Sequence, residues 1–263
     1  MHMDTDTQAQ PQAKLAEALA VATTLLDTDR RAWVIGIAWL AEEGRGRRPQ
    51  AEDVDPVLRA CRETEEFPCG AMGYVTMDGE PEINETYRMA AMHHRRDGAD
   101  YLDIRIALGV EGFLGYGFTR SGVLADGPGQ PNHVLLSDVE ATIADLAMLS
   151  AFSAAHLGYQ GPVETVIGIS WTGEPEPLRL RALDPETGEL GAGVEAAAFE
   201  PVFGSFGTDA DYGTQYGVVL RMATEAAQQF GISEPQLMPV PEPLLVDVHE
   251  VEQAVRQIPS DRG

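Results

Sequence analysis

The stretch SDVEATIADLAMLSAFSAAHL, residues 137–157, decides the fold, because it is long enough for a major helix and rich in small side chains. Its opening, Ser137-x-x-Glu140, matches a capping box, in which the hydroxyl and the carboxylate satisfy backbone N–H groups at the helix start. Gly158 supplies the matching stop signal. The many alanines would let the backbone approach a sheet closely, so we predict that this is the central helix.

On both sides of this helix the apolar residues alternate with the period of two that is typical of strands. Upstream, residues 101–118 read YLDIRIALGVEGFLGYGF, which predicts a hairpin of two strands around a glycine turn. Downstream, the expected elements are strands at 163–171, 178–183 and 194–199 and a long helix at 214–230. Adjacent strands interrupted by long helices favour an α+β fold, with an antiparallel or mixed sheet covered by two long helices.

The chain before residue 100 is predicted to be mainly helical, because its apolar residues recur at helical spacing. Trp33, Ile37 and Leu40 share one such stripe. Further helices are expected at 15–26, 52–63 and 81–96, and a strand at 72–77. We therefore divide the chain into a disordered tail, a mainly helical N-terminal region, an α+β sheet domain, and a Pro-rich linker with a short C-terminal helix, at residues 1–13, 14–99, 100–232 and 233–263.

Acidic side chains dominate the composition, with 42 Asp and Glu against 18 Lys and Arg and a net charge of −24. The excess is largest in residues 131–263, which hold 20 acidic and 5 basic side chains. A nucleic-acid backbone needs a positive patch that displaces its counterions, so this composition argues against a nucleic-acid partner. The same charge repels anionic membranes.

No segment is expected to cross a membrane or to direct secretion. The longest apolar run, residues 32–41, is far shorter than the roughly 20 residues that a spanning helix needs. The N-terminus has acidic residues where a secretory signal would have basic ones. Cys61 and Cys69 match no zinc spacing and are interpreted as reduced thiols. We therefore expect a cytoplasmic protein.

The sequence contains no recognisable catalytic or cofactor motif. Gly109, Gly112 and Gly115 resemble part of a phosphate loop, but they lie in the predicted hairpin and not between a strand and a helix. His93 and His94 are neighbours on a predicted helix, where successive side chains diverge and cannot chelate one metal together. We expect no cofactor and no metal site, and we favour a non-catalytic protein over an enzyme.

Four charged residues around position 100 are candidate binding residues. Arg95 and Arg96 end the predicted helix at 81–96 and form a local basic cluster. Asp103 and Arg105 are two apart on the next predicted strand and therefore share a face. If that face is covered, the two would form a charge-assisted hydrogen bond. The alternative for all four is a solvated surface position.

Arg179 and Arg181 repeat this spacing on a later predicted strand and are the only bases between Arg120 and Arg221. Two arginines on one face can receive an anion or the carboxylate of a partner, because the guanidinium fork matches carboxylate geometry. An ordinary solvated strand face is the alternative here as well.

Residues 204–213 form a polar, Gly-rich segment that leads into the last helix. A helix N-terminus favours anions, but Asp209 and Asp211 would oppose one and are better explained as helix caps. A cation site built from the two carboxylates is the alternative, since Mg²⁺ and Ca²⁺ prefer oxygen ligands.

Residues 136–231 resemble the C-terminal part of bacterial proteins of the Schlafen and AlbA-like group. The resemblance is carried by the helix end HLGYQGPV at 156–163, by the strand at 166–169 and by the late helix at 212–231, about a third of the chain. In that group an N-terminal module with acidic and lysine residues is associated with nucleic-acid binding or RNA cleavage. The single lysine of this chain, Lys14, does not reproduce that pattern, so no functional residue is carried over.

These observations favour a non-catalytic, cytoplasmic, regulatory or accessory protein that binds a protein partner. The absence of a catalytic motif, the acidic composition and the amphipathic helices predicted at both ends support this interpretation. The alternative is a nucleic-acid-binding or nuclease-type protein of the Schlafen/AlbA-like group. A third hypothesis is an enzyme that assembles His94, Asp103 and Arg105. No membrane partner is expected, and a homo-oligomer is left open.

Overall fold

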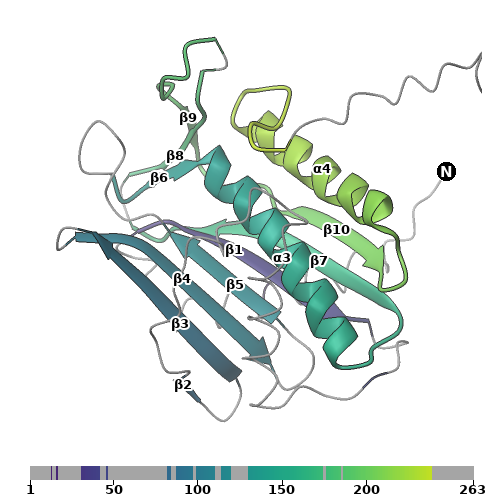
Figure 1. Ribbon diagram of the computed structural model, residues 1–263. Coiled ribbons are helices and arrows are strands. Elements are labelled where there is room, and N and C mark those ends of the chain that lie inside the picture. Colours follow the sequence, from purple (N-terminus) through teal and green to yellow (C-terminus); the bar gives the residue numbers. More distant parts are fainter. Residues whose placement is uncertain are drawn as a thin grey trace, which may run out of the picture.

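We describe the protein from a computed structural model, which covers residues 31–41, 130–173, 176–184 and 186–238, the backbone of four strands within residues 82–119, and the isolated residues 13, 16 and 46. The helices expected at 15–26 and 52–63, the strand expected at 72–77 and the C-terminal helix lie outside these residues, apart from one position of the first helix. The part of the chain that is described has an α+β fold with two sheets and two long helices (Figure 1).

The larger sheet has seven strands in the order β10-β7-β1-β5-β4-β3-β2, and every neighbouring pair is antiparallel. The predicted hairpin is confirmed as β4 and β5, which pair from Asp103 opposite Thr119 to Leu108 opposite Leu114. The strand bounds are β1 Trp33–Leu40, β2 Glu82–Ile83, β3 Tyr87–Arg96, β4 Ala99–Gly109, β5 Leu114–Thr119, β7 Pro162–Ser170 and β10 Val202–Gly207.

Two helices, α3 Leu136–His156 and α4 Tyr212–Gln229, cover the same face of this sheet and contact each other (Figure 1). The central helix α3 lies over β1, β5 and β7, and α4 lies over β10. Gly36 of β1 shows how closely α3 approaches, because a Cβ atom there would lie 3.1 Å from Leu146 and 3.2 Å from Thr142 of the helix. The predicted central helix and its close packing on a sheet are therefore confirmed. No helix of the described residues could span a lipid bilayer.

A smaller, three-stranded sheet stands at the N-terminal end of α3. Its strands are β6 His133–Leu135, β8 Leu178–Arg181 and β9 Val194–Ala196, with β6 parallel and β9 antiparallel to the central β8. Val134, Leu178 and Leu180 are buried and join the main core. Strand β6 continues directly into α3, so the core fixes the small sheet against the first turn of the helix.

The helix predicted around Trp33, Ile37 and Leu40 is wrong, because this segment forms β1 in the middle of the large sheet. Alternate residues of β1 enter two cores: Val34 and Ala38 pack beneath α3, whereas Trp33 and Ile37 belong to a second cluster that includes Val166 of β7. A strand buried on both faces is apolar throughout and shows no alternation. Its residues at helical spacing are then apolar by default, which explains the error.

The helix predicted at 81–96 is also wrong, because Tyr87–Arg96 forms β3 and pairs along its length with β4. Its Met, Ala and Arg residues favour helices by propensity, but cross-strand pairing overrides a preference of this size. The large sheet thus takes β1, β2 and β3 from the part of the chain predicted to be mainly helical, and its remaining strands from residue 99 onwards.

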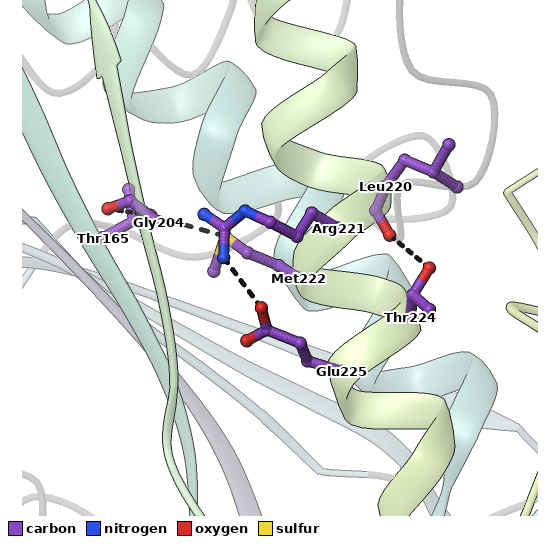
Figure 2. Close-up of polar contacts among 7 residues, drawn as sticks. All are labelled: Thr165, Gly204, Leu220, Arg221, Met222, Thr224 and Glu225. Carbon is purple, nitrogen blue, oxygen red and sulfur yellow. Dashed lines mark hydrogen bonds and ion pairs between the residues drawn. The ribbon is translucent and has the colours of Figure 1, made fainter. Parts of the chain in front are cut away.

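Two local predictions around the helices also need correction. Leu135, and not Ser137, occupies the N-cap position of α3, and no side chain caps the helix there. The polar, Gly-rich segment at 204–213 is not predicted to be a strand, but its first four residues belong to β10, which pairs with β7. A glycine is required at 204, where a Cβ would collide with the sulfur of Met222 and lie 2.7 Å from Oγ1 of Thr165, as the close approach of these residues in Figure 2 indicates.

Candidate functional site

The outward face of the small sheet gathers three basic side chains. Leu178 and Leu180 of β8 are buried, so the alternating residues Arg179 and Arg181 lie on the opposite, partly exposed face. Strand register places His133 beside Arg179. We call His133, Arg179 and Arg181 the arginine face. The sequence pattern identifies the two arginines as candidate binding residues but does not identify the histidine.

A glycine-containing loop positions both guanidinium groups. Arg179 forms an ion pair with Glu195 of β9 and donates to the carbonyl of Ala192 at 3.4 Å. Arg181 donates from Nε to the carbonyl of Gly191 at 2.8 Å. Gly193 closes this loop with φ of +84°, and a Cβ there would lie 2.7 Å from Cγ of Arg181. The loop therefore folds tightly over the aliphatic stems and holds the charged ends in place.

The two arginines differ in how far their charge is compensated. Arg179 has Glu195 as its counter-ion, whereas Arg181 donates only to backbone carbonyls among the residues described, at 191 and at 190. A guanidinium carries five N–H donors. The contacts of Arg181 engage Nε and Nη2, so Nη1 retains its donors for a ligand.

His133 has an environment that favours the neutral form of its ring. Burial lowers the pKa of His133 below its usual value, the positive charges of Arg181 and Arg179 lower it further, and Glu176 opposes them. Its Nδ1 is buried and has no hydrogen-bond partner in the described part of the chain. A neutral imidazole beside two guanidiniums provides a further polar group for a carboxylate or another oxyanion.

The other predicted binding residues lie in the large sheet. Strand register places Arg95 opposite Asp100 just after an irregularity at His94, and places Asp103 opposite both Thr119 and a histidine of β3. Asp103 and Arg105 are two apart on β4 and thus share a face, as expected. Arg96 is the last residue of β3. The structure therefore assigns Arg179 and Arg181 to one sheet and these four candidates to the other.

The residues of the hypothetical scattered active site do not share a face. His94 pairs with Leu102, which is adjacent to Asp103 on β4. Because successive residues of a strand alternate between faces, His94 lies on the face opposite to Asp103 and Arg105.

The expected helix cap before α4 is present. Asp211 accepts a hydrogen bond from the N–H of Thr214 at 2.8 Å, and this bond lowers the pKa of Asp211. Asp209 is exposed in the preceding turn. Among the described residues, no three His, Cys, Asp or Glu side chains are grouped as a metal site would require.

The sequence pattern does not identify the buried carboxylate of Glu140 on α3. Glu140 is fully buried and accepts hydrogen bonds from the backbone N–H groups of Gln236, Leu237 and Met238 at 2.8, 2.6 and 3.3 Å. Burial raises the pKa of Glu140, and the three N–H groups oppose that shift. This carboxylate fastens the segment after α4 to the first turns of α3; its assignment to a capping box concealed that role.

Comparison with protein-family models, with functionally curated proteins and with solved structures gave no significant match. The assignment of a function therefore depends on the chemistry of the residues themselves.

Proposed function

We propose that the protein is a non-catalytic, cytoplasmic protein of regulatory or accessory type that binds a protein partner, and that its arginine face receives a carboxylate of that partner. The observation that carries this proposal is the group of His133, Arg179 and Arg181 on one partly exposed face, with Arg181 lacking a carboxylate among the described residues. Fixed guanidinium groups bind carboxylates well, because little side-chain freedom is lost on binding.

The overall acidity of the chain restricts how such a partner is recognised. A net charge of −24 repels an acidic partner at long range. At physiological salt this repulsion is screened beyond about 8 Å, whereas a direct hydrogen-bonded contact is screened much less. The proposed recognition therefore depends on direct contacts between a few groups. It does not depend on long-range electrostatic attraction between the two proteins.

A defined probe, an oligo-glutamate peptide, tests this proposal through the titration of His133 followed by NMR. A bound carboxylate offsets the positive charges of the two arginines, so the pKa of His133 should rise when the peptide is added. The Nε–H signals of Arg179 and Arg181 should shift in the same titration.

Matched substitutions separate recognition at this face from nonspecific charge effects. Arg181→Gln should abolish the peptide-induced rise of the His133 pKa, and Arg181→Lys should retain part of it, because lysine keeps the charge without the fork. Arg221→Gln is the control, with a peptide too short to reach two copies of the chain, since Arg221 is an exposed arginine paired with Glu225 on α4. An unchanged His133 pKa in the wild type, or equal effects of the two Gln substitutions, would contradict the proposal.

A further inference from the structure

The edge strand β10 is a second surface, separate from the arginine face. It ends the large sheet beyond β7, and its sequence VFGSFG contains no charged residue and no proline. Natural sheets usually protect an exposed edge with lysine, proline, a bulge or a very short strand, because unpaired backbone groups invite another strand. Strand β10 has six residues and pairs regularly with β7, so none of these protections lies within the strand, and the nearest proline is Pro201 just before it.

The register identifies the backbone groups that the edge offers. The N–H of Thr208 donates to the carbonyl of Gly161 at 3.2 Å, so the bonded positions of β10 are the even-numbered ones. Phe203 and Ser205 consequently direct their N–H and C=O groups away from β7. Within the described residues, no backbone hydrogen bond satisfies these four groups. The next outward carbonyl, that of Gly207, accepts the N–H of Ala210 at 3.0 Å.

The flank of α4 beside this edge is electrically balanced. Gly204 lies beneath Val218 and Met222, which shows which side of the helix faces β10. Figure 2 shows Arg221 and Glu225 projecting from α4 on the side of Gly204. Their ion pair spans 2.9 Å, and both side chains are about half exposed, at 50% and 46%. The edge therefore offers an uncharged strand with the Arg221–Glu225 pair on its helix side and Glu164, which accepts the hydroxyl of Ser205, on β7 beside it.

We propose that a second copy of this chain adds its own β10 to this edge, antiparallel and about a two-fold axis, so that the two large sheets become continuous. A matching partner must supply an uncharged strand without proline, and beside it a helix flank that carries both an arginine and a glutamate. The β10 and α4 of a second copy meet both requirements. Such an isologous contact is self-complementary and closes after two copies.

The pairing brings the two α4 helices side by side over the extended sheet. Because they run antiparallel about the axis, the flank of each α4 that carries Arg221 and Glu225 lies beside the same flank of the other copy. The helix layer then covers the new strand pair as it covers β10 and β7 in the single chain (Figure 1). The exposed N–H and C=O groups of Phe203 and Ser205 lie symmetrically about Gly204, so a second β10 offers the same groups in the matching order.

The experiment is sedimentation velocity of the full chain over a range of concentrations, with Ser205→Pro and Ser205→Ala as the test and control variants. Proline removes the outward N–H at 205 without touching the bonds to β7. Both substitutions remove the hydroxyl that donates to Glu164 at 2.8 Å, so their difference reports the backbone donor. We expect a wild-type dimer whose dissociation constant increases about tenfold or more in Ser205→Pro, since two symmetric hydrogen bonds are lost, and about threefold or less in Ser205→Ala.

Hydrogen exchange of the wild type provides a readout that does not depend on any variant folding. The amides of Phe203 and Ser205 should become protected as concentration increases, whereas the amide of Gly204, already bonded to β7, should change little. The proposal is overturned if the wild-type chain is monomeric at every concentration and the amides of Phe203 and Ser205 stay unprotected. That result would mean that the strand that binds this edge, if any, comes from a different protein. A dimer that is equally stable in Ser205→Pro and in Ser205→Ala overturns it as well.

Discussion

Replacing Glu140 by alanine should detach the segment after α4 and cost about 3 kcal/mol of the free energy of unfolding. The carboxylate lies on the second turn of α3 and is fully buried. Its Oε2 accepts the N–H of Leu237 at 2.6 Å and that of Met238 at 3.3 Å, and Oε1 accepts the N–H of Gln236 at 2.8 Å. No backbone carbonyl replaces these acceptors among the described residues.

The magnitude follows from the two short bonds. A hydrogen bond to a charged group contributes about 1.5–3 kcal/mol, which would give about 3–6 kcal/mol for the bonds of Gln236 and Leu237. The cost of burying the carboxylate offsets part of this gain, as the raised pKa of Glu140 indicates. Detachment of residues 236–238 also limits the loss of stability, because their N–H groups are then hydrogen-bonded to water. The lower end of the range, about 3 kcal/mol, is therefore the expected value.

Glu140→Gln separates the acceptor from the charge. The amide oxygen still accepts one of the short bonds, and the cost of burying a charge disappears, so this variant should unfold within about 1 kcal/mol of the wild type at neutral pH. Urea unfolding measures the three proteins, and hydrogen exchange at residues 236–238 locates the change. Glu189→Gln is the surface control, because Glu189 is exposed in the turn after β8, with an expected loss of about 0.5 kcal/mol or less. Equal losses in Glu140→Ala and Glu140→Gln, or retained protection at 236–238 in Glu140→Ala, would refute this reasoning.

The pH dependence has a definite sign. Because the folded chain raises the pKa of Glu140 above its usual value of 4.5, the native state binds this proton more tightly than the unfolded state. The corresponding contribution to stability is fully present below that value and is lost as pH rises through the folded pKa. Glu140→Gln cannot lose this contribution, so the free energy of unfolding of the wild type should fall relative to that of the variant as pH rises above about 4.5.

Three further predictions concern a packing contact, a helix cap and the alternative function. Gly204→Ala should lower the free energy of unfolding by about 1–3 kcal/mol because its Cβ collides with a methionine of α4, whereas Gly168→Ala, with no atom within 4 Å, should cost nothing in the same urea titration. Asp211→Ala should lower the thermal midpoint and Asp211→Ser should not; since the pKa of Asp211 is lowered from 3.8, this stabilisation is present above that pH and disappears as pH falls through the folded pKa. If the chain instead acts as a nucleic-acid-binding protein, RNA or DNA should be retarded in a mobility shift at moderate salt, and Arg95→Ala with Arg96→Ala should abolish the retardation. Unretarded nucleic acid would contradict that alternative.

The sequence predicted those elements whose pattern has a single interpretation. The alternation in residues 101–108 fits one exposed and one buried face, and it corresponds to β4 at Ala99–Gly109. The helix expected at 137–157 corresponds to α3 at Leu136–His156, because a long run without glycine or proline bounded by Gly158 fits little else. The helix expected at 214–230 is α4 at Tyr212–Gln229.

The errors occur where tertiary contacts decide the outcome. Strand β1 is buried on both faces, so its eight residues show no alternation of apolar and polar side chains. Only its pairing with β5 and β7 defines it as a strand. Strand β10 contains two glycines that usually indicate a loop, but one of them is needed for the close approach of α4. Likewise Glu140 lies at the spacing of a capping box, yet its true partners are almost a hundred residues away. Local spacing carries no information about such partners.

The same limit applies to the arginine face. The spacing of Arg179 and Arg181 predicts a shared strand face, and the structure shows one, but His133 reaches it only through the parallel pairing of β6 with β8. Nothing near His133 in the sequence indicates that pairing. The predicted role of Arg179 and Arg181 in binding remains a prediction, because the observed contacts of both arginines also hold the loop between β8 and β9.

The two proposed surfaces have a joint consequence, because they lie on different sheets. Pairing at β10 leaves the arginine face of each copy open, so a dimer would present two carboxylate-binding faces to one partner. Linked binding of this kind raises affinity without any new contact, provided that one ligand spans both faces. Ser205→Pro should therefore weaken binding of a long oligo-glutamate chain and leave binding of a short one unchanged, whereas Arg181→Gln should weaken both. Equal loss of long and short ligands in Ser205→Pro would show that the strand edge and the arginine face are not independent.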